Sequence, residues 1–196
     1  VKIEHLLKYS RHLHKLRETG CLFVTSAVES VDDRTLRLLA KNHTRDDFFE
    51  VVRRFRQADL ILAPTFVPFT PWTSREDYQK LLNDLLELDL VENVAPIQLA
   101  IRLLIPAGSK LLELSETLSI LEGFDPAALS YRWKNSESQV ESLQADVLKL
   151  IKEGEAKSSS RREIFSAIWN RTNDGAEADL REPCAVSYTH LRAHET

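Results

Sequence analysis

The sequence contains no methionine and only two cysteines, Cys21 and Cys184. Two cysteines cannot build the disulfide framework of a small secreted domain, and their scarcity is typical of a reducing cytoplasm. Glycine and proline are also few, five and seven among 196 residues, which excludes collagen-like and low-complexity chains. We therefore expect a folded, cytoplasmic protein.

Long apolar runs are absent as well, and none approaches the roughly 20 residues that a membrane-spanning helix needs. No signal peptide precedes the first predicted helix. The formal net charge of −4 argues against a broad nucleic-acid-binding surface. With 43% hydrophobic residues, the sequence predicts one soluble globular domain that binds neither membrane nor nucleic acid.

Both ends of the chain are unusual. The first residues, VKIE, begin without methionine and have the pattern of a strand already under way. The last ten, SYTHLRAHET, match the translation of a sequencing-library adapter, so we expect residues 185–196 to lie outside the fold. His190 and His194 are four residues apart there, as in some zinc sites, but two ligands without a third predict no metal site.

Strand and helix patterns alternate along the first 115 residues. The predicted strands cover residues 21–28, 60–67 and 97–105, and residues 1–3 end another. The predicted helices cover residues 4–18, 32–41, 45–57 and 74–88. Thr44, with Asp47 three residues later, opens the third, and a capping box of Thr73 and Glu76 opens the last. The apolar pattern of residues 21–28 indicates a strand buried on both faces.

A strand and its helix together take roughly 35 to 40 residues, as in right-handed βαβ units on a parallel sheet. No G-x-G-x-x-G motif occurs, so a dinucleotide-binding sheet is not favoured. The sequence predicts an α/β fold, a partial TIM-like (β/α) barrel of parallel strands, over residues 1–122.

The pattern changes after Gly123. Asp125 and Pro126 have the chemistry of a helix start, an amphipathic helix follows, and Ser160 with Glu163 predicts a further capped helix. We interpret residues 123–173 as a C-terminal helical appendage packed on the barrel, and residues 174–184 as a loose tail.

Polar residues cluster where the predicted strands end, which in an α/β barrel is the side that carries the active site. Lys2 and Glu4 follow the first strand, Glu29 and Ser30 the second, and Arg102 lies in the fourth. Each has an alternative structural role. Ser30 can cap the next helix, Glu29 can form a salt bridge, and Arg102 must face a polar cavity or find a carboxylate. Trp72 and His43 are expected to be loop structure, and His5, His12 and His14 surface residues.

The segment LRETGCLFVTSAVESVDDRTLRLLAKNHT resembles the fifth-strand region of radical S-adenosylmethionine enzymes, particularly those that follow a cobalamin-binding domain. ILAPTFVPFTPWTSREDY and IRLLIPAGSKLLEL resemble the sixth and seventh strands of that family, and VKIEHLL the end of the fourth. FVPFTPWT, LAIRLLIPAGS and FDPAALSYRW are most similar to a subgroup named for its Cys-Cys-Ala-Glu-Pro or selenocysteine-containing tail, and REPC at residues 181–184 resembles the approach to such a tail. The matching residues in the first segment are Gly20, Cys21, Glu29, Ser30, Asp32, Asp33, Leu36, Lys41, His43 and Thr44.

The resemblance implies an enzyme that holds a [4Fe–4S] cluster on three cysteines and reductively cleaves S-adenosylmethionine to start radical chemistry. This chain lacks the Cys-x-x-x-Cys-x-x-Cys motif of that family. We therefore expect the C-terminal part of a longer protein, inactive alone, and a role for cobalamin stays open. The resemblance assigns cofactor binding to Lys2, Glu4, Glu29, Ser30, Thr65, Val67 and Pro68, and an anionic substrate, small molecule or peptide, to Arg102.

Two alternatives stay open. The chain could be half of a metal-independent TIM-barrel lyase or isomerase that uses Glu4, Glu29 and Arg102. It could instead serve through residues 123–173 as a helical module that binds a partner.

Overall fold

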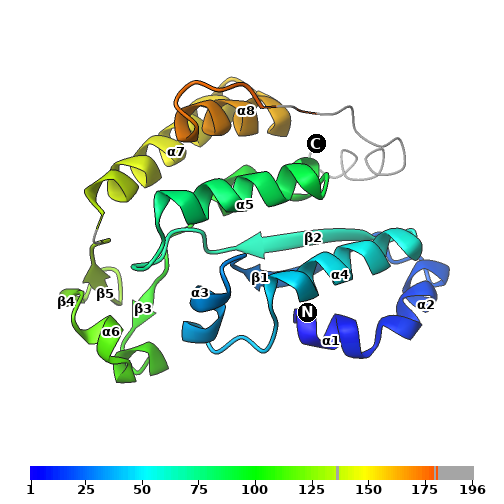
Figure 1. The fold of residues 1–196 in the computed structure, drawn as a ribbon, viewed down its shortest axis with the longest axis horizontal. Coiled ribbons are helices and arrows are strands. Elements are labelled where there is room, and N and C mark those ends of the chain that lie inside the picture. The colour runs from blue at the N-terminus through cyan, green and yellow to red at the C-terminus, as the bar shows by residue number, and fades with distance from the viewer. Residues whose placement is uncertain (136, 179, 181–196) are drawn as a thin grey trace.

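The computed structural model describes residues 1–135, 137–178 and 180 (Figure 1). The strands are β1 (Phe23–Glu29), β2 (Ile61–Phe66), β3 (Ile105–Pro106), β4 (Leu121–Asp125) and β5 (Ser130–Trp133). The α-helices are α1 (Ile3–Lys8), α2 (Leu13–Glu18), α3 (Asp33–Leu38), α4 (Arg45–Gln57), α5 (Arg75–Glu87), α6 (Ser115–Leu118), α7 (Ser138–Ala156) and α8 (Arg161–Thr172). Four 3-10 helices are η1 (Ser10–His12), η2 (Val91–Asn93), η3 (Pro96–Leu99) and η4 (Lys110–Glu113).

The parallel part of the fold is the pair β1 and β2, with Phe23 opposite Ile61. A parallel bridge joins Lys2 to Ala27 of β1, and another joins Phe69 to Arg102 after β2. Four segments thus run parallel, and their parallel pairings join segments that follow one another along the chain. The described residues contain no closed barrel. The structure confirms a mixed α/β fold with a parallel sheet, and the partial barrel stays a prediction.

The predicted strand at residues 97–105 is wrong. Pro96 opens the 3-10 helix η3, and only the bridge at Arg102 and the short β3 follow in this stretch. The amide oxygen of Gln98 accepts the hydrogen bond from Phe66 N, 3.1 Å away, where a neighbouring strand would have supplied a carbonyl. An apolar run of this length does not by itself distinguish a strand from a buried irregular segment.

The helix expected to begin at Asp125 and Pro126 is also wrong. This stretch forms an antiparallel hairpin of β4 and β5, and β3 pairs with β5 to complete a three-stranded sheet. The Asp125 carboxylate accepts hydrogen bonds from Ala127 N and Ala128 N, so it closes the hairpin loop. Aspartate stabilises such turns by the same local bonding with which it caps helices, which explains the misassignment.

One face of the β1–β2 sheet is packed and the other is open. Ser26 and Val28 of β1 and Leu62 of β2 are buried among the helices, while Phe23 and Thr25 are exposed on the opposite face. The expectation that residues 21–28 are buried on both faces is therefore wrong. Phe23 keeps 44% of its surface in water, so this strand has an apolar face without a cover among the described residues.

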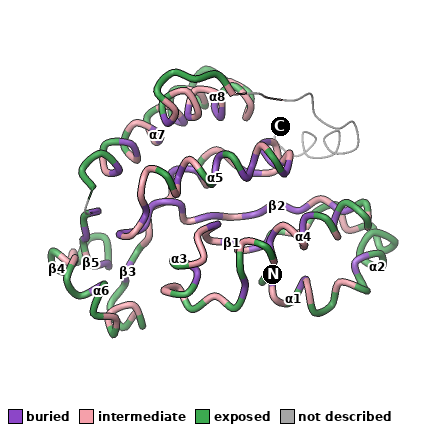
Figure 2. Tube along the Cα trace, viewed as in Figure 1, coloured by how far each residue is buried: buried purple, intermediate pink, exposed green. Residues whose placement is uncertain are grey.

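The α7–α8 pair packs over α5 (Figure 1). Ile164, Phe165 and Ile168 of α8 are buried in the hydrophobic core, and Figure 2 shows buried stretches on α5, α7 and α8. Arg75 of α5 donates to the Thr172 carbonyl at the end of α8, 2.7 Å away, and to Asp174 beyond it. The tail expected to be loose from residue 174 is thus held at its first residue.

Capping boxes begin three of the helices, and two are those predicted: Thr44 with Asp47 for α4, and Ser160 with Glu163 for α8. The box of α5 uses Ser74 and Asp77, one residue later than predicted, because Thr73 turns its hydroxyl to the Pro68 carbonyl. The predicted helix at residues 4–18 is divided into α1, η1 and α2.

Removing the positive charge at Arg45 should destabilise the fold. Its guanidinium donates to both oxygens of Asp84 at 2.7 Å, and the Asp84 side chain is only 3% exposed. Arg45→Met leaves this carboxylate buried and unpaired, which should lower the free energy of unfolding by roughly 3 to 5 kcal/mol. Arg53→Met, which removes an exposed pair with Glu50, should leave the free energy of unfolding nearly unchanged. Urea unfolding measures the free energy of unfolding of both variants, and equal losses would show that Arg45 does not stabilise the buried Asp84 carboxylate.

Gly154→Ala should also destabilise the protein, although alanine favours a helix. A Cβ at position 154 of α7 would lie 2.5 Å from Ile164 Cγ1 of α8. The helix propensity gain of about 1 kcal/mol is smaller than an overpacking cost of roughly 1 to 3 kcal/mol. We expect a lower midpoint in urea unfolding. The exposed Glu155→Ala on the same helix is the control, and a raised midpoint for Gly154→Ala would refute the close contact.

Candidate functional site

The end of β1 has an irregular backbone that redirects Glu29. Ala27 pairs with Thr65 and Glu29 with Phe66, so Val28 has no partner residue and the strand bulges. Glu29 has a φ of 70°, in the left-handed region that non-glycine residues rarely adopt. Val67 N donates to the Glu29 carbonyl at 2.8 Å and holds the bulge. Bulges and strained residues of this kind are concentrated next to functional sites.

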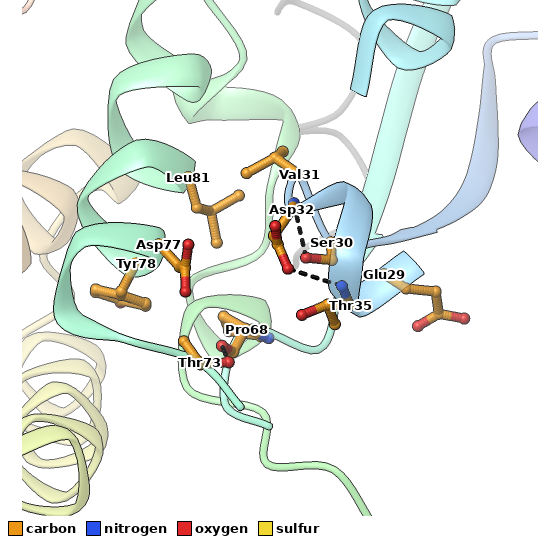
Figure 3. Close-up of a pocket in the computed structure, with 10 residues that line it drawn as sticks. All are labelled: Glu29, Ser30, Val31, Asp32, Thr35, Pro68, Thr73, Asp77, Tyr78 and Leu81. Carbon is orange, nitrogen blue, oxygen red and sulfur yellow. Dashed lines mark hydrogen bonds between the residues drawn. The ribbon is translucent and has the colours of Figure 1, made fainter. Parts of the chain in front are cut away.

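The Glu29 carboxylate is bound by Lys41. Lys41 Nζ lies 2.8 Å from Glu29 Oε1, and the two side chains keep 30% and 20% of their surface exposed. The carboxylate points away from the neighbouring side chains of the loop (Figure 3). The salt-bridge alternative for Glu29 is therefore confirmed, with a partner that the sequence did not single out for this role.

Lys2 and Glu4 lie beside the same turn. The Asn42 side chain, by a hydrogen bond, and then the Lys2 ammonium hold the pKa of the Glu4 carboxyl below its ordinary value. Lys2 Nζ is 3.4 Å from Glu4 Oε1. Asn42 is adjacent to Lys41 in the chain, so three predicted site residues converge on one turn. We call Lys2, Glu4, Glu29, Lys41 and Asn42 the strand-end cluster.

Ser30 faces a small hollow between α3 and the start of α5 (Figure 3). The predicted cap role of Ser30 is wrong, because Asp32 caps α3 by accepting from Arg34 N and Thr35 N. Ser30 Oγ instead accepts from Asp32 N at 3.0 Å. The hollow has room for about one water molecule. The hollow is therefore too small to hold a nucleoside.

The residues predicted to bind a cofactor at the end of β2 and just after it already take part in local hydrogen bonds. Thr65 Oγ1 donates to Ser26 O at 3.4 Å, and Val67 N is used by Glu29. The Pro68 carbonyl accepts from Thr73 Oγ1 at 3.0 Å, and Pro68 lines the same hollow as Ser30. Residues 65–68 thus lie next to Glu29 and Ser30.

Arg102 lies elsewhere and has found a carboxylate. Its guanidinium donates to both oxygens of Glu141 in α7, at 2.7 and 3.0 Å, and to the Trp133 carbonyl at 2.5 Å. It also stacks over the Trp133 ring, 3.6 Å from the centroid. Burial would raise the pKa of Glu141, but the Arg102 and Asn135 donors lower it overall. Of the two alternatives for Arg102, the structure shows the ion pair.

His43 ties the Lys41 turn to β1. Its Nε2 lies 3.1 Å from the Val28 carbonyl, which can only accept, so Nε2 carries the proton. The ring is buried, and this burial holds its pKa below the ordinary value of 6.5. The expectation that His43 is loop structure is confirmed.

Within residues 1–135, 137–178 and 180, no group of three or more His, Cys, Asp or Glu could hold a metal ion. Cys21 is a free thiol before β1, and Cys184, His190 and His194 lie outside the described residues. In the described part of the chain, no helix is both long enough and apolar enough to cross a membrane. No protein-family model matches the chain.

Acid should destabilise this protein through His43. The unfolded chain takes up a proton near the ordinary pKa of 6.5, whereas the folded chain does so only at lower pH. Below about pH 6.5 the unfolded state therefore binds more protons, and the free energy of unfolding falls with falling pH. His43→Gln keeps a donor without titrating, so its thermal midpoint should fall less between pH 7.5 and 5.5. The exposed His14→Gln is the control, and identical slopes for His43→Gln and the unchanged chain would refute the linkage.

Proposed function

We propose that this chain is the C-terminal part of a radical S-adenosylmethionine enzyme and supplies one wall of its cofactor site. The observation that supports the proposal is the convergence of Lys2, Glu4 and Glu29 at one edge of three parallel segments, with Ser30 and residues 65–68 alongside. In a (β/α) barrel this edge is the side on which the loops meet around a ligand.

The residues of the strand-end cluster suit the polar parts of S-adenosylmethionine. A carboxylate such as Glu29 can accept hydrogen bonds from two neighbouring ribose hydroxyls. A lysine such as Lys2 can bind the methionyl carboxylate as a point charge. The open face of β1 and β2, with Ala27 and Ala63, offers an apolar surface beside them for the adenine ring.

The iron–sulfur cluster does not fit the residues of this chain. Such a cluster needs three protein thiolates, and the sequence contains two cysteines. In an intact enzyme the rest of the protein would have to hold the cluster, which would supply the electron that cleaves the cofactor. This chain would orient the nucleoside and exclude water from it.

Two other functions have weaker support. In a metal-independent lyase, Arg102 would have to bind substrate, yet three of its donors are used by Glu141 and Trp133. Arg102 would have to give up the same bonds in order to hold an anionic substrate in the radical enzyme. A partner-binding role for α7 and α8 is less well supported because Ile164, Phe165 and Ile168 are buried in the core of this chain and are not available to a partner.

Under anaerobic reconstitution with iron, sulfide and a strong reductant, we expect this chain not to take up a stoichiometric four-iron cluster. It should also form no 5′-deoxyadenosine from S-adenosylmethionine, because the thiolate ligands are too few. Iron and sulfide analysis with chromatography of the nucleoside products measures both. Stoichiometric cluster uptake with deoxyadenosine formation by this polypeptide alone would overturn the proposed fragment.

A further inference from the structure

The turn after α3 makes three contacts with the ends of two parallel segments. Lys41 Nζ binds the Glu29 carboxylate, and His43 Nε2 binds the Val28 carbonyl. Between them, the Asn42 side chain hydrogen-bonds to Glu4 at the start of α1. The turn is itself fixed by Lys41 N, which donates to the Leu36 carbonyl at 2.9 Å. It therefore presents the Lys41 ammonium at a defined place.

Stability alone does not account for the Lys41–Glu29 pair. The buried His43 contact already fastens the turn to β1. A partly exposed ion pair of this kind adds little to folding. Glu29 adopts its left-handed conformation beside the turn, so the pair lies where the backbone has been distorted to redirect one side chain.

The pair also leaves half of the carboxylate available. Lys41 binds Oε1 of Glu29, and no other described residue donates to Oε2. An ionised carboxylate accepts hydrogen bonds at both oxygens. Lys41 thus fixes the rotamer of Glu29 while Oε2 is left to receive a ligand hydroxyl.

We infer that Lys41 is a positioning residue, which aims the Glu29 carboxylate at a hydroxyl-bearing ligand such as the ribose of S-adenosylmethionine. This inference rests on the proposed function. Lys41 acts through Glu29 and does not itself touch the ligand. Its role differs from that of Lys2, which reaches Glu4 from a largely exposed position.

The test is a ligand-observed NMR titration of this chain with S-adenosylmethionine at low salt, with a thermal midpoint recorded for each variant. The unchanged chain should bind with a dissociation constant on the order of 1 mM. Lys41→Met should weaken binding about fivefold to tenfold, because Glu29 is no longer held. Lys41→Arg should retain affinity within about twofold, since arginine restores the charge-assisted bond.

Two further variants separate positioning from structure. Lys134→Met removes a Lys–Glu pair of the same 2.8 Å length, with Glu122, far along the chain, and should leave affinity unchanged. The exchange Glu29→Lys with Lys41→Glu restores an ion pair but removes the carboxylate at position 29, so its thermal midpoint should match that of the unchanged chain while its affinity stays reduced.

Each outcome has a distinct meaning. No saturable binding to the unchanged chain would count against the cofactor site of the proposed function, and the inference would fall with it. Binding by the unchanged chain with equal affinity for Lys41→Met would overturn the role of Lys41 alone. Recovery of affinity in the exchanged pair would show that the contact is merely structural.

Discussion

The second half of the chain depends on the guanidinium of Arg102. It stacks on Trp133, binds both oxygens of Glu141, and so joins the parallel segment after β2 to the hairpin and to α7. Glu141 also accepts from Asn135 N, and the Asn135 amide donates to the Thr70 and Thr73 carbonyls before α5. A cation in an otherwise apolar stretch requires such compensation, because burying it unpaired would be costly. The network therefore positions α7, and with it α8, over α5.

The strand-end cluster follows a different logic. Its Lys2–Glu4 pair has a largely exposed lysine, so this pair adds little to folding. Its side chains are held in place by the backbone, because the bulge, the left-handed Glu29 and the buried His43 fix the turn after α3 against the end of β1. The Arg102 network thus joins elements of the fold, and the strand-end cluster shapes a surface.

Sequence patterns predicted the parts of this fold that are determined locally. The capping boxes at Thr44 and Ser160 and the strands β1 and β2 follow from side chains within a few residues of one another. The wrong predictions have non-local causes. Gln98 replaced a strand pairing through a side-chain bond to Phe66, and Asp125 used its capping chemistry to close a hairpin. Likewise, the sequence indicates that Glu29 can form a salt bridge and that an apolar stretch leaves Arg102 in need of a carboxylate or a polar cavity. The partners are 12 residues away for Glu29, at Lys41, and 39 residues away for Arg102, at Glu141. No periodicity links such distant positions.

The open face of the β1–β2 sheet has a consequence for the protein in solution. Leu22 and Phe23 each keep 44% of their surface in water, beside a face that the described helices leave bare. Contact between such faces removes apolar surface from water, and salts such as sulfate strengthen this tendency. Adding ammonium sulfate should therefore drive copies of the chain together at concentrations at which sodium chloride leaves them dispersed. Light scattering at matched ionic strength would reveal the difference, and equal scattering in the two salts would show that the face is covered.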